Sequence, residues 1–156
     1  MKEKFEIGEQ GRKDIADGLN IYLANLHVLY AKLHNFHWNV EGRGFFQIHS
    51  KLEELYTDTA EEIDVVAERI LQLGHRPTST LKEYLEVAQI KEVPSKKFTS
   101  EEVCTALLED YGFLINELRK GIKQAEKYED EVTVDFAVGT LAKREKLVWM
   151  LKAFLG

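Results

Sequence analysis

Histidines and carboxylates in the first half of the chain are spaced so that they could bind a metal ion. His49 and Glu53 lie four positions apart, and so do Asp64 and Glu68. Residues four apart lie one turn apart on the same side of an α-helix, so each pair could chelate a cation. Imidazole nitrogen and carboxylate oxygen, without a thiolate, suit Fe(II), Mn(II) or Zn(II) better than Cu(I), and redox chemistry favours iron. The alternative is an acidic helix surface in which such pairs arise by chance.

The two pairs cannot meet within a single helix. His49 and Asp64 are 15 residues apart, which is roughly 22 Å along a helix axis. They can meet between two copies of the helix packed antiparallel about a two-fold axis, because the numbers of facing residues then have a constant sum. His49 with Glu68 and Glu53 with Asp64 both sum to 117. The spacing favours two identical sites shared by a dimer, and His37 could add a nitrogen if the glycine-containing turn after it folds the chain back.

The sequence lacks the residues that two other iron centres require. Di-iron sites in the core of ferritin-type bundles use Glu-x-x-His, and no glutamate here has a histidine three residues later. Met1 and Met150 are the only methionines, so the second predicted helix has none that could bind a haem. We therefore expect a metal site at a subunit interface and no haem.

Four long helices must position these residues. Apolar side chains recur every three or four positions over four stretches, which start near Asp14, Phe46, Ser100 and Val132, with Ser100 as a capping residue. Residues 81–87 predict a short helix, capped by Ser79 or Thr80, in the connection between the second and third long helices. The sequence predicts an all-α protein, a four-helix bundle with a short extra helix in the crossover. A bundle without any chemistry is the alternative.

Length and charge limit the classes of protein to consider. The 156 residues fit one domain that spans residues 1–156. The net charge of −6 disfavours a general nucleic-acid binder that uses a basic face, and it suits a protein that attracts cations. Cys104 is the only cysteine and cannot form an internal disulfide. No apolar run follows the first residues as a signal peptide or anchor, so we expect a cytoplasmic protein without membrane contact.

The motif HNFHWNVEG at residues 34–42 resembles the Dps family of miniferritins, within the ferritin-like superfamily. The similarity continues through Phe45, Phe46, His49, Asp64 and residues 67–69, and it extends to residues 79–83 and 149–155. The resemblance implies a hollow dodecamer of four-helix subunits with a ferroxidase site across each two-fold interface. In that site His37, His49 and Glu53 would come from one subunit, and Asp64 and Glu68 from its partner. Glu53 stands where the family usually has Asp, so the carboxylate is kept but the second iron could be shifted or bound more weakly.

The resemblance also implies an activity. Members of the family bind Fe(II), oxidise it in pairs, commonly with hydrogen peroxide in preference to oxygen, and store ferric oxide inside the shell. This chemistry would protect the cell and its DNA from oxidative damage. Trp38, beside His37, matches an aromatic residue close to the iron site that could quench radicals, and packing at the dimer interface is the equal alternative.

Further acids match positions that the family uses for iron entry and storage. Glu126 and Asp135 match acids that line a three-fold pore, where carboxylates would raise the local concentration of Fe(II). Glu54 and Glu61 could face the cavity and nucleate mineral. For Asp130 and Glu131 the attraction between acids and a helix N-terminus is the stronger explanation.

Two other functions stay open at this stage. One is a nucleoid protein that protects DNA by physical coverage. Family members that bind DNA tend to use a lysine-rich tail, whereas residues 1–13 have a net charge of only +1, from Lys2, Lys4, Arg12 and Lys13 against Glu3, Glu6 and Glu9. DNA binding and association with the nucleoid are therefore doubtful. The other is a scaffold or receptor-binding shell whose metal sites are idle.

Overall fold

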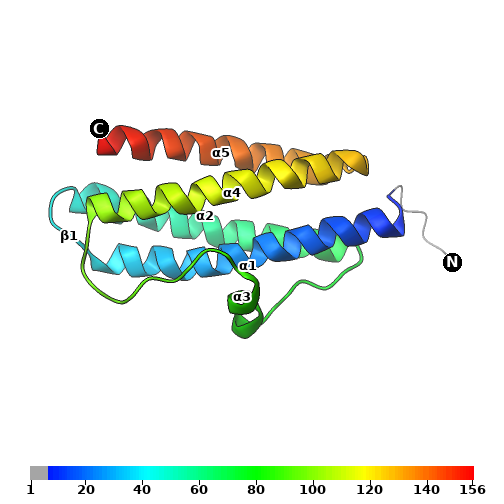
Figure 1. The fold of residues 1–156 in the computed structure, drawn as a ribbon, viewed down its shortest axis with the longest axis horizontal. Coiled ribbons are helices and arrows are strands. Elements are labelled where there is room, and N and C mark those ends of the chain that lie inside the picture. Colours follow the sequence, from blue (N-terminus) through cyan, green and yellow to red (C-terminus); the bar gives the residue numbers. More distant parts are fainter. Residues whose placement is uncertain (1–6) are drawn as a thin grey trace.

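Four long helices and one short helix make up the fold. The computed structural model describes residues 7–156, so Lys2, Lys4, Glu3 and Glu6 of the expected tail lie outside the described residues. In chain order the elements are α1 (Glu9–Asn39), β1 (Val40–Glu41), α2 (Phe45–Gln72), α3 (Leu81–Val87), β2 (Phe98–Thr99), α4 (Ser100–Lys127) and α5 (Glu131–Leu155). The long helices lie side by side, and α3 stands on the crossover at one side (Figure 1). The predicted four-helix bundle with an extra helix in the crossover is confirmed.

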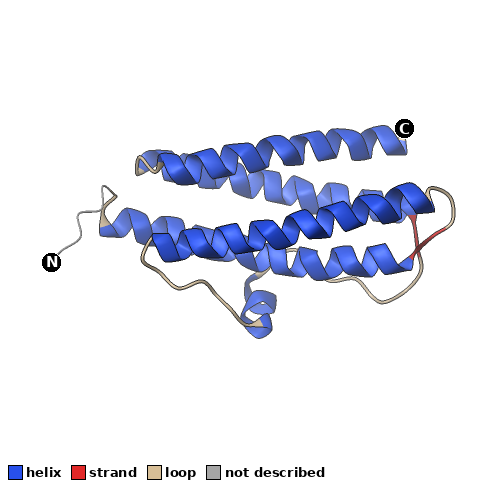
Figure 2. Ribbon diagram, turned by 180° about the vertical axis from the view of Figure 1, so that it is seen from behind, coloured by secondary structure: helices blue, strands red, loops and turns tan. Residues whose placement is uncertain are grey.

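The bundle is built from two helical hairpins, α1 with α2 and α4 with α5. A short parallel pair of strands ties one hairpin to the other, with Val40 of β1 opposite Phe98 of β2 (Figure 2). The core side chains come from the predicted apolar faces, and Leu26, Leu33, Val66, Leu107 and Leu114 are all buried. No helix among the described residues is both long and apolar enough to span a membrane.

The ends of two helices differ from the prediction. Helix α1 begins at Glu9 rather than Asp14, and its first turns include Gly11, which packs against the Tyr128 ring, where a Cβ would lie 2.8 Å from the ring carbons. The cap of α4 is Thr99, not Ser100: Thr99 and Glu102 form a reciprocal capping box. Ser100 instead donates its hydroxyl hydrogen to the carbonyl oxygen of Arg43.

Some residues of the apolar patterns do not face the bundle. Phe46, Val132 and Phe154 are exposed in the isolated chain, although their spacing places them on the predicted apolar stripes. A stripe that is wider than the buried face leaves its outer members in solvent, or for contact with another chain.

Asparagine side chains of α1 hold the crossover in place. Asn25, fully buried, accepts hydrogen bonds from the backbone N–H groups of Gln89 and Ile90 at 2.8 and 2.9 Å. Asn35 donates to the carbonyl oxygen of Val93 at 3.0 Å. A buried backbone group needs a partner, and here a side chain of α1 supplies it. The crossover is therefore fixed to α1 although it contains only one short helix of its own.

Candidate metal site

His37 and His49 form a closely packed pair where α1 ends and α2 begins. Their rings are stacked with centroids 3.8 Å apart and an interplanar angle of 14°. The Nδ1 atom of each lies 2.8 Å from the backbone carbonyl oxygen of the other. A carbonyl oxygen only accepts, so each neutral ring carries its hydrogen on Nδ1 and keeps the lone pair of Nε2 free. Two nitrogen donors are thus oriented by the backbone before any ion binds.

A glycine turn makes this reciprocal contact possible. Gly42 and Gly44 adopt φ values of +89° and +80°, a region that favours glycine over residues with a Cβ. At Gly44 a Cβ would also lie 3.0 Å from the Phe154 ring. The turn reverses the chain within a few residues, and the first turn of α2 lies against the last turn of α1. The fold-back that was needed to bring His37 to His49 is therefore present.

Glu53 lies one helical turn beyond His49, and Tyr56 lies beside both the carboxylate and the histidines. The Tyr56 hydroxyl is 3.4 Å from Oε1 of Glu53. Its ring stacks on His34 at 4.0 Å and meets the His37 ring edge-on at 5.2 Å. Desolvation and the negative Glu53 raise the pKa of Tyr56, which keeps the hydroxyl protonated as a donor. Sequence reasoning missed Tyr56, although its spacing of three from Glu53 and seven from His49 was a usable signal.

Asp64 and Glu68 lie on the same helix but far from the histidine pair. Both side chains are exposed, and Asp64 is 15 residues from His49 along a continuous α2, which is roughly 22 Å. Among residues 7–156, no cluster of three or more histidine, cysteine or acidic side chains is arranged to hold a metal ion. One chain therefore brings His37 and His49 together, with Glu53 one helical turn after His49, and it leaves Asp64 and Glu68 far from this pair.

The residue next to Glu68 is anchored to the start of α5. Arg69 donates to Oδ1 of Asp130 at 2.7 Å and to the hydroxyl of Thr133 at 3.0 Å. Asp130 is buried and caps α5 by accepting from the backbone N–H of Thr133. Its role at the helix N-terminus is as expected. Hydrogen bonds between α2 and the start of α5 therefore fix the segment that carries Glu68.

Trp38 points away from the bundle and is 71% exposed. It lies next to the His34 ring, with centroids 5.3 Å apart, so it adjoins the ring cluster around His37. Phe46, in the first turn of α2, is 79% exposed. Two large aromatic side chains in solvent beside the histidine pair leave this part of the surface uncovered in the isolated chain.

Comparison with known proteins places this arrangement in a family. The model of the Ferritin-like domain matches residues 16–156. DNA protection during starvation protein 2 of Bacillus anthracis is 46% identical over 143 residues, covering 92% of this chain and 97% of that protein. A Dps crystal structure from Bacillus brevis superposes with a TM-score of 0.90 at 43% identity, covering 94% of this chain and 98% of the other. The chain belongs to the Dps family of miniferritins.

A more distant Dps structure agrees with this assignment. The Dps protein of Vibrio cholerae O1, described as a member of a broad superfamily of ferritin-like diiron-carboxylate proteins, has a TM-score of 0.92 at 36% identity. It covers 96% of this chain, and this chain covers 94% of it. The expected family is confirmed, and membership in a di-iron carboxylate superfamily implies that Dps proteins of this kind bind iron.

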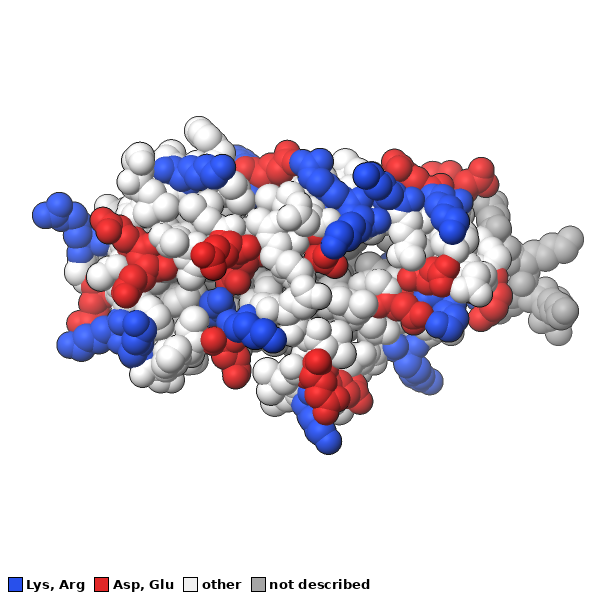
Figure 3. Space-filling view, viewed as in Figure 1, with Lys and Arg blue, Asp and Glu red and all other residues white. Residues whose placement is uncertain are grey.

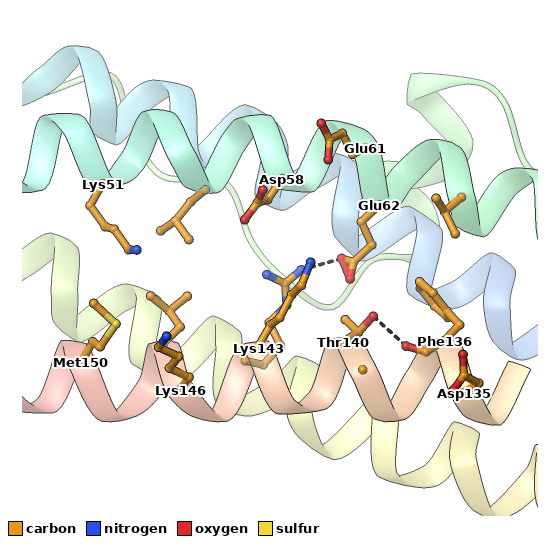
Figure 4. A pocket seen from close by; sticks show the side chains of 15 residues that line it. Lys51, Asp58, Glu61, Glu62, Asp135, Phe136, Thr140, Lys143, Lys146 and Met150 are labelled. Carbon is orange, nitrogen blue, oxygen red and sulfur yellow. Dashed lines mark hydrogen bonds and ion pairs between the residues drawn. The ribbon is translucent and has the colours of Figure 1, made fainter.

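The other acids expected from the Dps resemblance lie on two surfaces. Glu126 and Asp135 both line a groove where α4 ends and α5 begins, together with Glu129 and Glu131. Glu61 lines a second groove, between α2 and α5 (Figure 4). Glu54 forms an ion pair with Lys51 at 2.9 Å. The first groove is strongly acidic, whereas the second also carries Lys143 and Lys146.

The centre of the bundle, where ferritin-type proteins place their iron ligands, is occupied by a protein cation. Four buried residues meet there, one from each long helix: Tyr22, Glu62, Tyr111 and Arg144. The Arg144 guanidinium pairs with Oε2 of Glu62, and the Tyr22 hydroxyl donates to Oε1 of Glu62 at 3.1 Å. The guanidinium also lies 5.0 Å from the centroid of the Tyr111 ring. This Dps subunit therefore neutralises its central carboxylate with Arg144.

Charges of both signs are mixed over the face of the molecule that Figure 3 shows. Patches of Lys and Arg lie between patches of Asp and Glu on this face. A surface of this kind does not present the continuous basic stripe that tracks a phosphate backbone.

Proposed function

We propose that this chain is the subunit of a cytoplasmic ferroxidase that stores iron. It would oxidise Fe(II), with hydrogen peroxide in preference to oxygen, and keep ferric oxide inside a hollow dodecamer. The observation that carries the proposal is the reciprocal pair of His37 and His49, whose Nε2 lone pairs are left free, with Glu53 one helical turn after His49 on α2. Membership in the Dps family supports the same activity.

The iron site would be shared between two subunits. His37, His49 and Glu53 of one subunit would face Asp64 and Glu68 of its partner, because antiparallel α2 helices bring these positions together. The three carboxylates carry three negative charges, which favour Fe(III) over Fe(II) by Coulomb attraction. The proposal accounts for two acids that lie apart from the histidine pair within one chain.

The proposed reaction takes one electron from each of two irons. Two Fe(II) ions, one hydrogen peroxide molecule and two protons give two Fe(III) ions and two water molecules. The O–O bond receives both electrons together, so hydroxyl radical is not released. Trp38, next to the ring cluster and exposed, could donate an electron to a stray radical, which would limit damage beyond the protein.

Iron would enter at the acidic groove between α4 and α5 and be stored beside acids of α2. Glu126 and Asp135 lie in a groove with further carboxylates, and such a concentration of negative charge attracts Fe(II). In a dodecamer this groove would line a three-fold pore. Glu54 and Glu61, on α2, would face the cavity and nucleate the mineral.

Anaerobic loading with Fe(II), followed by hydrogen peroxide, tests the proposal. We expect Fe(III) to form rapidly, as measured by its absorbance, with two irons oxidised per peroxide consumed. His37→Ala and Asp64→Asn should each slow the oxidation at least about tenfold, because each removes a ligand from the shared site. His75→Ala, a histidine beyond the end of α2, is the matched control and should react like the native protein. Unchanged rates in both ligand variants would refute the site.

The names of the relatives, DNA protection during starvation proteins, raise a second function, protection of DNA by physical coverage. It requires DNA binding at physiological salt and neutral pH. The net charge of −6 and the mixed surface charges oppose this binding. We expect no gel shift under these conditions, and a clear shift would favour coverage over iron chemistry as the protective mechanism.

A further inference from the structure

Tyr56 contacts both a histidine and the carboxylate of the candidate site. Its ring is held by three other rings: it stacks on His34 at 4.0 Å, and it meets His37 and Tyr30 edge-on at 5.2 and 6.5 Å. These contacts come from α1, whereas Tyr56 itself belongs to α2. The ring therefore has little freedom to turn, and its hydroxyl occupies a defined position beside the proposed metal ligands.

The Tyr56 hydroxyl also contacts the carboxylate of Glu53. Oε1 of Glu53 lies 3.4 Å from the Tyr56 hydroxyl oxygen. An aspartate would end one carbon–carbon bond earlier, about 1.5 Å closer to the backbone, so we expect it not to reach the hydroxyl. Hydrogen bonds that are long in the free protein often shorten when the ligand binds. The contact with Tyr56 therefore depends on the longer glutamate side chain.

We propose that Tyr56 is a positioning residue for metal binding, which holds Oε1 of Glu53 so that Oε2 is presented to the metal. The inference rests on the proposed function, since it concerns a ligand of the same shared site. A glutamate has one more rotatable bond than an aspartate and loses more rotamer freedom when it binds. A hydrogen bond from a fixed hydroxyl offsets that loss, and partners of this kind orient metal-binding carboxylates generally.

Binding of Co(II) without oxygen tests the role without depending on oxidation. Co(II) is titrated into the assembled protein, and affinity and the visible absorption bands of the bound ion are recorded. Tyr56→Phe keeps the ring and its stacking but removes the hydroxyl. We expect Co(II) to bind about tenfold more weakly to this variant, with altered absorption bands. Tyr30→Phe, which removes a hydroxyl from the neighbouring ring, is the matched control and should bind Co(II) like the native protein.

The Glu53→Asp background shows whether Tyr56 acts through Glu53. In this background the carboxylate does not reach the hydroxyl, so Tyr56→Phe should cause no further loss of affinity. An equal loss in both backgrounds would overturn the inference, because Tyr56 would then act by another route. Native affinity and bands in Tyr56→Phe would also overturn it.

One further variant separates this inference from the proposed function. His37→Ala should weaken Co(II) binding whether or not Tyr56 has a role. If His37→Ala binds Co(II) like the native protein, the shared site itself is wrong, and this inference falls with it. If His37→Ala weakens binding while Tyr56→Phe does not, the site is supported and the role of Tyr56 alone is refuted.

Discussion

The ion pair between Glu62 and Arg144 shows how much a single central residue matters to this bundle. Both side chains are buried, and Glu62 has two hydrogen-bond donors, Tyr22 and Arg144. Burial raises the pKa of Glu62, and Arg144 opposes this rise. An intact buried ion pair contributes little net stability, but removal of one partner leaves an uncompensated buried charge and is strongly destabilising.

We predict that Arg144→Met lowers the free energy of unfolding by about 3–5 kcal/mol near pH 7.5, as measured by denaturant titration. The variant also changes the pH dependence. Without the guanidinium the folded pKa of Glu62 rises further, so the folded state holds a proton that the unfolded chain releases. The loss of unfolding free energy is therefore complete at pH values above the pKa of Glu62 in the folded variant. It becomes smaller as the pH falls toward the ordinary pKa of a glutamate.

The double variant Glu62→Gln with Arg144→Met is the control for this prediction. The amide that Glu62→Gln introduces would keep an oxygen for the Tyr22 hydroxyl but carry no charge. We expect the double variant to recover part of the lost stability and to lose the pH dependence. A loss in Arg144→Met that stays constant as the pH is lowered would show that packing, rather than the carboxylate charge, causes it.

Sequence reasoning found the residues whose chemistry is distinctive and missed those whose role depends on contacts between helices. His37 and His49 stand out because histidines are few and one helical turn separates the second from a carboxylate. Tyr56 and Arg144 resemble ordinary helix residues in the sequence. Their partners, Glu53 or Glu62 together with rings on other helices, become evident only when the helices are packed.

At the scale of elements, the crossover depends on side chains of α1 rather than on its own structure. Asn25 satisfies two backbone N–H groups of the crossover with one oxygen, and its amide N–H donates to the carbonyl oxygen of Ile21. These bonds lie in a part of the crossover just after α3. They fix where the chain passes from the α1–α2 hairpin to α4.

We predict that Asn25→Leu loosens the crossover, because the N–H groups of Gln89 and Ile90 lose their acceptor. The free energy of unfolding should fall by about 1–3 kcal/mol, and hydrogen exchange should become faster in residues 88–95. Asn25→Asp keeps the accepting oxygen and is the matched control, with slower exchange than Asn25→Leu. Equal exchange in the two variants would show that these bonds do not hold the crossover.

The helices themselves were predictable, whereas some of their ends were not. Apolar side chains that recur every three or four residues define α1 and α2 without tertiary information. The first turns of α1 pack against Tyr128 through Gly11, a contact between residues far apart in the sequence. The choice between Thr99 and Ser100 as the cap depends on Glu102, three residues after Thr99, and this spacing was a readable capping-box signal.

At the scale of the whole molecule, the isolated subunit leaves large apolar side chains uncovered on several elements. Besides Trp38 and Phe46 near the histidine pair, Leu81 of α3 is 76% exposed and Trp149 of α5 is 65% exposed. Exposed apolar surface at separate places favours contact with more than one neighbouring subunit. This distribution agrees with a closed assembly and complements the division of the proposed ligands between chains.

A mixture of two inactive subunits should regain activity if the site is shared. A dimer of one His37→Ala and one Asp64→Asn subunit has both defects in one site and an intact second site. Random co-assembly of equal amounts should restore about a quarter of the native sites, measured as the rate of Fe(II) oxidation by peroxide. Co-assembly of His37→Ala with His49→Ala is the control and should restore none. No recovery in the first mixture would contradict a site shared in this way.

The reciprocal bonds of His37 and His49 have a consequence for assembly. Each subunit orients its two histidine nitrogen donors alone, so in the proposed shared site only docking of the partner would be needed to add the remaining carboxylates. Thermodynamic linkage then requires reciprocity: an ion that bridges the two halves tightens the dimer by the same factor by which dimer formation tightens the ion. On this arrangement iron is an effector of quaternary structure as well as a substrate, and its supply would help determine how much of the protein is assembled.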